Sequence, residues 1–349
     1  MKKYYTRACN FFYGKTSRNL VLKKLSLPLS GNNNISFDTI EIISRKSINK
    51  IKVKDLKKIS KKQRQKIYLD IKNLVKKKKI KNLKFNNLPI LMGILNLTPD
   101  SFSDGGKYNK KNIGYRHAKK LIKDGCSILD IGGESTRPGS KEISTSKEWN
   151  RISSVIKRVK DLKTFISLDT RKSIVMKKGI SNKINLINDV SGLGYDNNTI
   201  NVLKKTKIPF VIHHMKGNPS NMQNNPKYKN VLLDIYDFFE QKINYIRSHG
   251  IKHNNIILDP GIGFGKNLKH NITLIRNISI FHSLGFPIML GTSRKKFIKE
   301  LSGVNDSNMR LGGTISSNLY ALMHGVQILR IHDVNEVNQS IKVFKSLNF

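Results

Sequence analysis

The chain has 349 residues, of which 38% are hydrophobic and 25% charged, the balance of an ordinary folded protein. Its net charge is +42, from 65 basic and 23 acidic side chains, and no apolar run reaches the roughly 18 residues that a membrane-spanning helix needs. Two cysteines, Cys9 and Cys126, are too few for a disulfide framework or a four-ligand zinc site, which favours a reducing, cytoplasmic location.

The first 88 residues differ in composition from the rest, and we expect residues 1–88 to form a Lys-rich, partly ordered N-terminal extension. They carry 25 basic and 4 acidic side chains, a net charge of +21. The apolar positions from Asn34 to Ser44 predict a strand, and a helix is possible in the Lys-rich stretch from Val53 to Lys79. The chain is also rich in Ile and Asn, and an excess of Lys, Ile and Asn together is typical of an A/T-rich genome. The alternative explanation of the Lys excess is a nucleic-acid-binding surface.

From residue 89 to residue 349, short apolar runs alternate with stretches of helical periodicity. The runs are continuously apolar, as expected for parallel strands that are buried on both faces. Eight strand–helix units predict an α/β fold, a (β/α)8 TIM barrel over 89–349, in preference to a doubly wound open sheet. The predicted strands are Ile90–Leu97, Ser127–Gly132, Phe165–Asp169, Asn185–Asp189, Pro209–His214, Ile256–Asp259, Pro287–Gly291 and Val326–His332.

Nearly every polar or charged residue of note lies at the end of one of these runs. Because the carboxyl ends of barrel strands converge on one face, these side chains should meet there. A single Asp at a strand end is equally well explained as the N-cap of the next helix, but capping alone does not explain all eight ends. The strand-end residues include Asn96, Glu134–Arg137, Asp169, Asn188, Asp189, His213, His214, Asp259, Ser293–Lys295, Arg330 and His332.

The residue types at these ends indicate two kinds of ligand group. Asp169, Asn188 and Asp259 can accept hydrogen bonds from the N–H groups of a flat heterocycle. Arg330 and His332 lie two apart on a strand and can point to the same side, and the loops after the last two barrel strands often bind phosphate. We expect a donor-rich heterocycle near the barrel axis and a phosphate at the rim, where Arg330 would contribute little to stability.

The loop from Asn96 to Gly106 is long, rich in small residues and ends in glycines, which suits a mobile lid. Its Asn and Asp side chains offer oxygen ligands for Mg2+, which prefers phosphate oxygens together with one or two protein oxygens. The same residue types are equally typical of an ordinary surface loop.

Taken together, these segments closely resemble the dihydropteroate synthase family, the folate-pathway enzymes that sulfonamides inhibit. The matching motifs run in family order across about residues 90–349, and the first two are close to diagnostic. The motifs are Met92–Gly106, Asp130–Gly139, Ser167–Thr170, Ile187–Val190, His214–Gly217, Asp259–Lys266, Ser293–Lys295 and Arg330–Val334.

The resemblance implies a transferase that condenses 6-hydroxymethyl-7,8-dihydropterin diphosphate with 4-aminobenzoate, giving 7,8-dihydropteroate and diphosphate. By motif, the pterin would be held by Asp169, Asn188, Asp259 and Lys295. The diphosphate would be held by Thr136, Arg330, His332 and, through Mg2+, Asn96. The aminobenzoate would be covered by Phe102, Asp104, Arg137 and Pro138, with Phe264 nearby. The implied catalytic residues are Asp104, Asp169, Asp259, Lys295 and Arg330.

The residues agree with this chemistry. Diphosphate leaves a CH2 group attached to an electron-rich ring, so a cation delocalised over the dihydropterin can form. Asp169 and Asp259 would stabilise that cation, while Mg2+, Arg330 and His332 would stabilise the departing diphosphate. No nucleophilic side chain is required, and neither cysteine lies in the motifs.

Three positions depart from the family pattern. His213 and Lys216 stand where the family commonly has Met and Gln, near the expected pterin pocket, and Lys296 stands where a Ser is frequent. The resemblance also implies a short hairpin, containing residues 35–44, that closes the bottom of the barrel. It further implies a homodimer formed through the later helices.

Two other functions remain open from the sequence. A pterin-dependent methyltransferase would share the barrel and the Asp/Asn/Asp pterin site. It has no leaving diphosphate, however, and does not require Ser293–Lys295 together with Arg330 and His332. A basic nucleic-acid-binding protein, built on a barrel that has lost its catalytic activity, would explain the net charge. It would not explain why the site residues are intact. We therefore expect no specific nucleic acid partner and no membrane partner.

Overall fold

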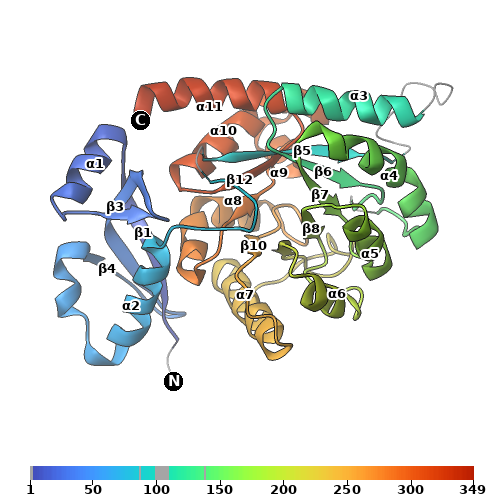
Figure 1. Ribbon diagram of the computed structural model, residues 1–349. Helices are drawn as coiled ribbons and strands as arrows, with labels where there is room; N and C mark the ends of the chain where they lie inside the picture. The colour runs from blue at the N-terminus through green and yellow to red at the C-terminus, as the bar shows by residue number, and fades with distance from the viewer. Residues whose placement is uncertain (1–2, 86–87, 99–109, 137–138) are drawn as a thin grey trace.

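The computed structural model describes residues 3–85, 88–98, 110–136 and 139–349. Within these ranges, eight parallel strands form one sheet in the order β10-β9-β8-β7-β6-β5-β12-β11. A bridge between Leu258 and Ile288, with the Leu258 amide donating to the Pro287 carbonyl at 2.9 Å, brings the two edge strands together. The predicted (β/α)8 barrel is thereby confirmed, and Figure 1 shows its strands enclosed by helices.

Each predicted barrel strand is present and agrees with the prediction to within two residues at either end. The strands need no amphipathic pattern because helices cover their outer faces while side chains fill the interior. The strands are β5 (Ile90–Asn96), β6 (Ile128–Gly132), β7 (Phe165–Asp169), β8 (Leu186–Asp189), β9 (Phe210–His213), β10 (Ile256–Asp259), β11 (Met289–Leu290) and β12 (Ile328–Ile331).

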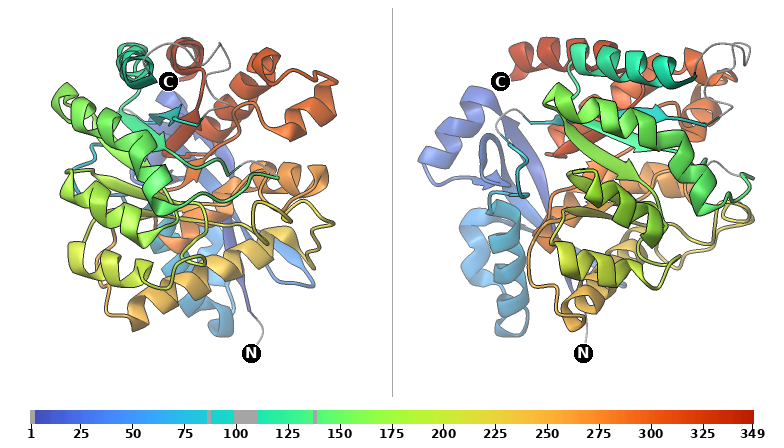
Figure 2. Two further views of the ribbon diagram at one scale, coloured as in Figure 1. Left: turned by 90° about the vertical axis from the view of Figure 1, so that its right-hand side faces the viewer. Right: turned by 45° about the vertical axis from the view of Figure 1, so that its right-hand side comes forward.

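The helices that follow the strands lie around the outside of the barrel (Figure 2). Helix α7 (Val231–Ser248) lies in one of the stretches of helical periodicity that the sequence shows between its apolar runs. Among the helices of the described ranges, none combines the length and the apolar character needed to span a bilayer. The helices are α3 (Lys110–Lys123), α4 (Thr145–Val159), α5 (Ser173–Ser181), α6 (Thr199–Thr206), α7 (Val231–Ser248), α8 (Leu268–Arg276), α9 (Lys296–Ser302), α10 (Leu311–Met323) and α11 (Val334–Asn348), with 3-10 helices at Lys160–Leu162 (η3), Ile278–Leu284 (η4) and Ser307–Met309 (η5).

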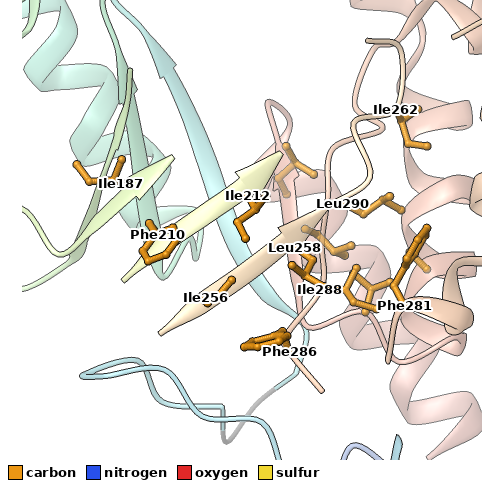
Figure 3. Close-up of a cluster of buried hydrophobic side chains, with 14 of the residues drawn as sticks. Ile187, Phe210, Ile212, Ile256, Leu258, Ile262, Phe281, Phe286, Ile288 and Leu290 are labelled. Atoms are coloured by element: carbon orange, nitrogen blue, oxygen red, sulfur yellow. The ribbon is translucent and has the colours of Figure 1, made fainter. Parts of the chain in front are cut away.

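Alternation along the strands separates two apolar layers. In β10, Ile256 and Leu258 belong to the large cluster between strands and helices, part of which Figure 3 shows. Ile257 points the other way and joins the cluster at the amino ends of the barrel strands. Because side chains alternate with a period of two, Asp259 shares the inner side with Ile257. By the same spacing, Arg330 lies two residues beyond Ile328, an inner residue of β12.

The N-terminal region forms a unit of its own beside the amino ends of the barrel strands, at the left in Figure 1. This end of the barrel is called its lower end. Among the described residues it contains a four-stranded antiparallel sheet in which β3 pairs with β1, β2 and β4. Tyr5 packs edge-on against Tyr236 of α7 at 5.1 Å between ring centroids, which joins this unit to the barrel. Its elements are β1 (Tyr5–Tyr13), α1 (Gly14–Leu22), β2 (Leu27–Leu29), β3 (Asn32–Ile43), β4 (Ile48–Lys52), η1 (Val53–Lys58) and α2 (Lys61–Val75).

The segment between α2 and β5 fills the lower end of the barrel. Ile80 is buried there among the inner side chains of the strands, with Leu83, Phe85 and Leu88 packed against the same cluster. The strand expected at 34–44 is present as β3, but its Ile35 belongs to the separate core of the N-terminal sheet. The side chains of this cluster that come from outside the barrel strands are therefore those of Ile80, Leu83, Phe85 and Leu88, not those of the predicted 35–44 hairpin.

Candidate functional site

A polar pocket opens at the carboxyl ends of the barrel strands. It combines carboxylate, amide, imidazole, ammonium and guanidinium groups with a few apolar side chains. Several of the residues predicted from strand ends meet in it, although they come from strands far apart in sequence. The pocket is lined by Asn188, Val190, His213, Asp259, Ile262, Phe264, Gly291, Lys295 and Arg330.

Arg330 lies at the centre of a buried ionic arrangement. Its Nε donates to Oδ2 of Asp130 at 2.7 Å, and one Nη donates to Oδ2 of Asp169 at 2.7 Å. The Asp130 and Asp169 side chains are 0% and 8% exposed. Burial lowers the pKa of Arg330, but the two carboxylates outweigh it and raise that pKa above its ordinary value. The guanidinium therefore stays charged and bridges two carboxylates across the barrel.

This position differs from the rim placement expected for Arg330. The cation that pairs with Asp333 at the rim is Arg294, whose Nε donates to Oδ2 of Asp333 at 3.0 Å. Arg330 instead points inward because it lies two residues beyond Ile328 on β12. The rim placement of Arg330 is therefore wrong. Since its removal would leave two buried carboxylates without their cation, we expect a substantial contribution to stability.

Asn188 and Asp130 present hydrogen-bond acceptors to the pocket region. Nδ2 of Asn188 donates to Oδ2 of Asp130 at 3.1 Å. Oδ1 of each residue is buried and has no hydrogen-bond partner among the described residues. Buried acceptors without partners are costly, so this arrangement favours a ligand that brings N–H donors.

Burial raises the pKa values of Asp259, which lines the pocket, and of Asp169, which accepts from the pocket residue Arg330. Asp259 is 3% exposed, and burial raises its pKa to about 6, although the Gly261 amide and Lys295 oppose the rise. Burial also raises the pKa of Asp169, and the nearby Arg330 opposes that rise. Both groups therefore lie close to the range in which a carboxyl group can exchange a proton at neutral pH.

Lys295 and Phe264 form one wall of the pocket. The Nζ of Lys295 lies 4.1 Å from the Phe264 ring centroid. Burial lowers the pKa of Lys295 to about 8, with the positive charge of Arg330 acting in the same direction. The Phe264 ring also packs edge-on against His213, at 4.5 Å between centroids. This wall combines an apolar surface with a cation that can lose its proton readily.

Of the three departures from the family pattern, one reaches the pocket. His213 lines it, with Nδ1 3.0 Å from the Val190 carbonyl. Lys216 is exposed, and its Nζ donates to the Lys227 carbonyl outside the pocket lining. Lys296 is also exposed and pairs with Glu300 on α9, at 3.2 Å between Nζ and Oε1.

Four predicted site residues of the described ranges, Asn96, Thr136, Asp169 and His332, are not among the residues that line the pocket. A Cβ placed on Gly132 would lie 3.6 Å from both Oδ1 of Asn96 and Oδ2 of Asp169, so both oxygens lie close to this glycine. Nδ1 of His332 lies 3.0 Å from Oγ of Ser293. Thr136 is half-buried on the loop after β6. Within the described ranges, no group of three or more His, Cys, Asp or Glu residues forms a metal site of its own.

Four of the predicted site residues, Phe102, Asp104, Arg137 and Pro138, lie outside the described residues. One residue that the sequence did not single out, Asp130, is central to the site. The signal for it was present, because Asp130 is a carboxylate inside the otherwise apolar run Ser127–Gly132.

Comparisons with known proteins agree with this geometry. A family model described as "Pterin binding enzyme" matches residues 92–332. Dihydropteroate synthase from Neisseria meningitidis serogroup C is 40% identical over 262 residues, which covers 74% of this chain and 93% of that protein. The enzyme of the same name from Escherichia coli K12 is 38% identical over 259 residues, covering 74% of this chain and 91% of that protein.

Solved structures of the same name share the fold. Yersinia pestis dihydropteroate synthase with a sulfonamide drug complex aligns with a TM-score of 0.72 at 36% identity, covering 77% of this chain and 98% of that one. The Xanthomonas albilineans enzyme in complex with 7,8-dihydropteroate aligns with a TM-score of 0.69 at 30% identity, covering 76% of this chain and 95% of that one.

Proposed function

Because this chain belongs to the dihydropteroate synthase family of pterin-binding enzymes, we propose that the pocket at the carboxyl ends of its strands carries out the family's condensation. The enzyme is a transferase that joins 6-hydroxymethyl-7,8-dihydropterin diphosphate to 4-aminobenzoate and releases diphosphate. The resemblance read from the motifs is confirmed, and the roles of individual residues proposed below are supported by the pocket geometry.

The pterin is bound through its N–H groups. Asp169, Asn188 and Asp259 supply acceptors on neighbouring or nearby strands, and the buried Oδ1 of Asn188 gains the partner that it lacks among the described residues. Lys295 donates to a pterin oxygen or ring nitrogen from the Phe264 wall. Satisfying these buried groups favours a flat, donor-rich heterocycle over ligands that lack such donors.

In the reaction, the bond between the pterin CH2 carbon and the diphosphate oxygen breaks, and a bond from that carbon to the aminobenzoate nitrogen forms. The amine gives up one proton as the bond forms. Positive charge on the pterin is stabilised by Asp169 and Asp259, and negative charge on the departing diphosphate by Arg330, His332 and Thr136. Asp104, Phe102, Arg137 and Pro138 are proposed, from their motifs, to surround the aminobenzoate.

Mg2+ is proposed as the cofactor, held by Asn96 together with diphosphate oxygens. Oδ1 of Asn96 and Oδ2 of Asp169 both lie close to Gly132, and oxygen atoms of this kind are ligands that Mg2+ accepts. When bound, the metal would neutralise charge on the leaving diphosphate. A site with one amide oxygen needs the substrate to complete the coordination, which fits the lack of an all-protein metal cluster within the described ranges.

The arrangement of Arg330 between Asp130 and Asp169 carries the proposed roles, since it places a permanent cation beside a pterin-binding carboxylate. The test is a coupled assay of dihydropteroate formation with the full-length enzyme. We expect turnover that requires both substrates and stops when EDTA removes Mg2+. Turnover that EDTA leaves unchanged would overturn the metal assignment, and Asp259→Asn with unchanged activity would overturn the pterin assignment.

We also propose that the enzyme works as a cytoplasmic homodimer with no specific nucleic acid or membrane partner. Both cysteines are free thiols, which suits a reducing compartment. Exposed apolar side chains on the later helices support association there: Leu301 of α9 is 61% exposed, and Val343 and Leu347 of α11 are 57% and 78% exposed. Light scattering should give the mass of a dimer, and Leu347→Lys should lower it to that of a monomer if α11 lies in the interface.

A further inference from the structure

A buried ionic cluster lies beside the loop that joins β6 to α4. It contains Glu134 on the loop, Glu148 on α4, and Arg171 and Lys172 between β7 and α5. Oε2 of Glu134 accepts from Nε of Arg171 at 2.9 Å, and Nζ of Lys172 lies 2.8 Å from Oε1 of Glu134 and 2.9 Å from Oε2 of Glu148. None of the four side chains is more than 9% exposed, so water and salt screen these pairs little.

Glu134 connects the two ends of the loop. The amide of Ile143, shortly before α4, donates to Oε1 of Glu134 at 3.1 Å. Nζ of Lys172 also donates to the Ile143 carbonyl at 2.6 Å. At the start of the loop, Arg151 of α4 donates to the Gly133 carbonyl at 2.8 Å. Glu134 thus links the start of the loop, where it lies, with the end of the loop at Ile143. Its carboxylate also attaches both to the turn after β7, through Arg171 and Lys172.

The cluster reaches the active site along two short paths. Thr170, the neighbour of Asp169, donates from its hydroxyl to Oε1 of Glu148 at 2.5 Å. In the other direction, Thr136 follows Glu134 by two residues on the loop. Burial raises the pKa of Glu134, but the hydrogen bonds from Arg171 and Lys172 outweigh it and hold that pKa below its ordinary value. Glu134 is therefore ionised at neutral pH, as its contacts require.

We propose that Glu134 is a positioning residue for the diphosphate end of the substrate. It fixes the loop backbone that presents Thr136, through its charge-assisted bonds to Arg171 and Lys172, and it does not touch the substrate itself. This inference rests on the proposed binding of diphosphate by Thr136. Loss of the carboxylate charge should therefore weaken recognition of the diphosphate and leave recognition of the pterin ring intact.

The test compares Glu134→Gln with the wild-type enzyme. Glutamine has the same shape and can still accept from the Ile143 amide, but it cannot pair with two cations. We expect the KM for the pterin diphosphate to rise about tenfold or more, because small displacements of a binding group are costly. Binding of 6-hydroxymethylpterin without diphosphate, measured by calorimetry, should stay within about twofold of wild type.

Glu142→Gln is the matched control. Glu142 lies on the same loop and faces Arg171, but its side chain is 54% exposed and 3.8 Å away, so its charge matters little. We expect a KM close to wild type. Equal KM values for the Glu134 and Glu142 variants would overturn the inference. A Glu134→Gln variant that binds 6-hydroxymethylpterin more weakly and also melts at a lower temperature would overturn it too, because Glu134 would then act on the fold as a whole.

Thr136→Val separates this inference from the proposed function. If that variant raises the KM for the pterin diphosphate while Glu134→Gln does not, the positioning role alone fails. If Thr136→Val leaves the KM unchanged, the diphosphate assignment fails and the positioning role with it. If Glu134→Gln does not fold, Lys172→Arg replaces it, because arginine keeps the positive charge but differs in length and shape. A rise in KM confined to the diphosphate substrate would then support the inference. An unchanged KM would overturn it.

Discussion

Arg330 is expected to serve both the stability of the fold and the proposed binding of substrate. Replacement by Met should lower kcat about a hundredfold, as for other preorganised charge stabilisers. It should also destabilise the fold by about 3–5 kcal/mol, because Asp130 and Asp169 would keep buried negative charge without its cation. Activity and denaturant unfolding should be measured on the same preparation.

Arg294→Ala provides the contrast for stability. Arg294 pairs with Asp333 at the rim, and its side chain is 29% exposed, so its loss should cost no more than about 1 kcal/mol. Equal unfolding free energies for the Arg330 and Arg294 variants would contradict the buried role that we assign to Arg330.

Asp259 should make stability depend on pH. Burial raises its pKa from an ordinary value of 3.8 to about 6, so the folded protein binds a proton more tightly than the unfolded chain does. Its stabilising contribution is complete below pH 3.8 and is lost as the pH rises through about 6. A shift of about two units corresponds to about 3 kcal/mol.

Asp259→Asn should therefore be inactive but more stable than wild type at pH 8, by up to about 3 kcal/mol, with the difference vanishing near pH 4. Asparagine can still accept from the Gly261 amide, which donates to Oδ1 of Asp259 at 2.8 Å. Urea unfolding at several pH values measures this difference. A variant that is less stable than wild type at pH 8 would show that the attraction to Lys295 outweighs burial.

Much of the site could be predicted at the residue scale, because strand-end residues converge in a barrel whatever their distance in sequence. This reasoning brought Asp169, Asn188, Asp259 and Arg330 together correctly. It placed Arg330 at the rim, whereas the structure places it between two buried carboxylates. Whether a strand residue points inward depends on whether it lies an even number of residues from another inward-pointing residue, such as Ile328. It also overlooked Asp130, which lies within β6 and not at its end.

At the scale of elements, the described segment at residues 80–85 should act as a plug that matters for stability and not for catalysis. Ile80 is 5% exposed among the inner side chains at the barrel's lower end, whereas the active site lies at the carboxyl ends of the strands. Ile80→Ala should cost about 2–4 kcal/mol of unfolding free energy, with KM values unchanged. Chemical denaturation and steady-state kinetics measure the two effects.

Leu69→Ala on α2 serves as the control, because Leu69 is 55% exposed and its truncation should change stability by no more than about 0.5 kcal/mol. If Ile80→Ala were as mild as Leu69→Ala, the plug would contribute nothing to the barrel.

The elements of the barrel were predictable because parallel strands buried on both faces are read from continuous apolar runs. Those of the N-terminal unit were less so. Strand β1 has charged and polar residues between its apolar ones, and it is stabilised by pairing with a distant segment, with Cys9 opposite Thr39. Local sequence carries little information about such pairing. Within this unit the sequence predicted only β3 and a helix in the stretch that contains α2.

At the scale of the whole molecule, the net charge of +42 should produce weak attraction to nucleic acid without specificity. We expect a fluorescein-labelled DNA duplex to bind at 0.05 M salt and to be released by about 0.2 M salt, with the same affinity for unrelated sequences. Fluorescence anisotropy measures both. Tight, sequence-selective binding at physiological salt would contradict the proposal that nucleic acid is not a partner.

The position of the ionic cluster has an optical consequence. The chain contains one tryptophan, and it is Trp149, the immediate neighbour of Glu148 on α4, partly buried against the barrel core. Lys178 lies 6.0 Å from its ring. Indole emission responds to nearby charge and to water. When tryptophan is excited selectively over the 11 tyrosines, the fluorescence of this enzyme therefore comes from a single reporter beside the residues that hold the β6–α4 loop. Stopped-flow measurements can therefore follow that region as substrates bind, with no label attached.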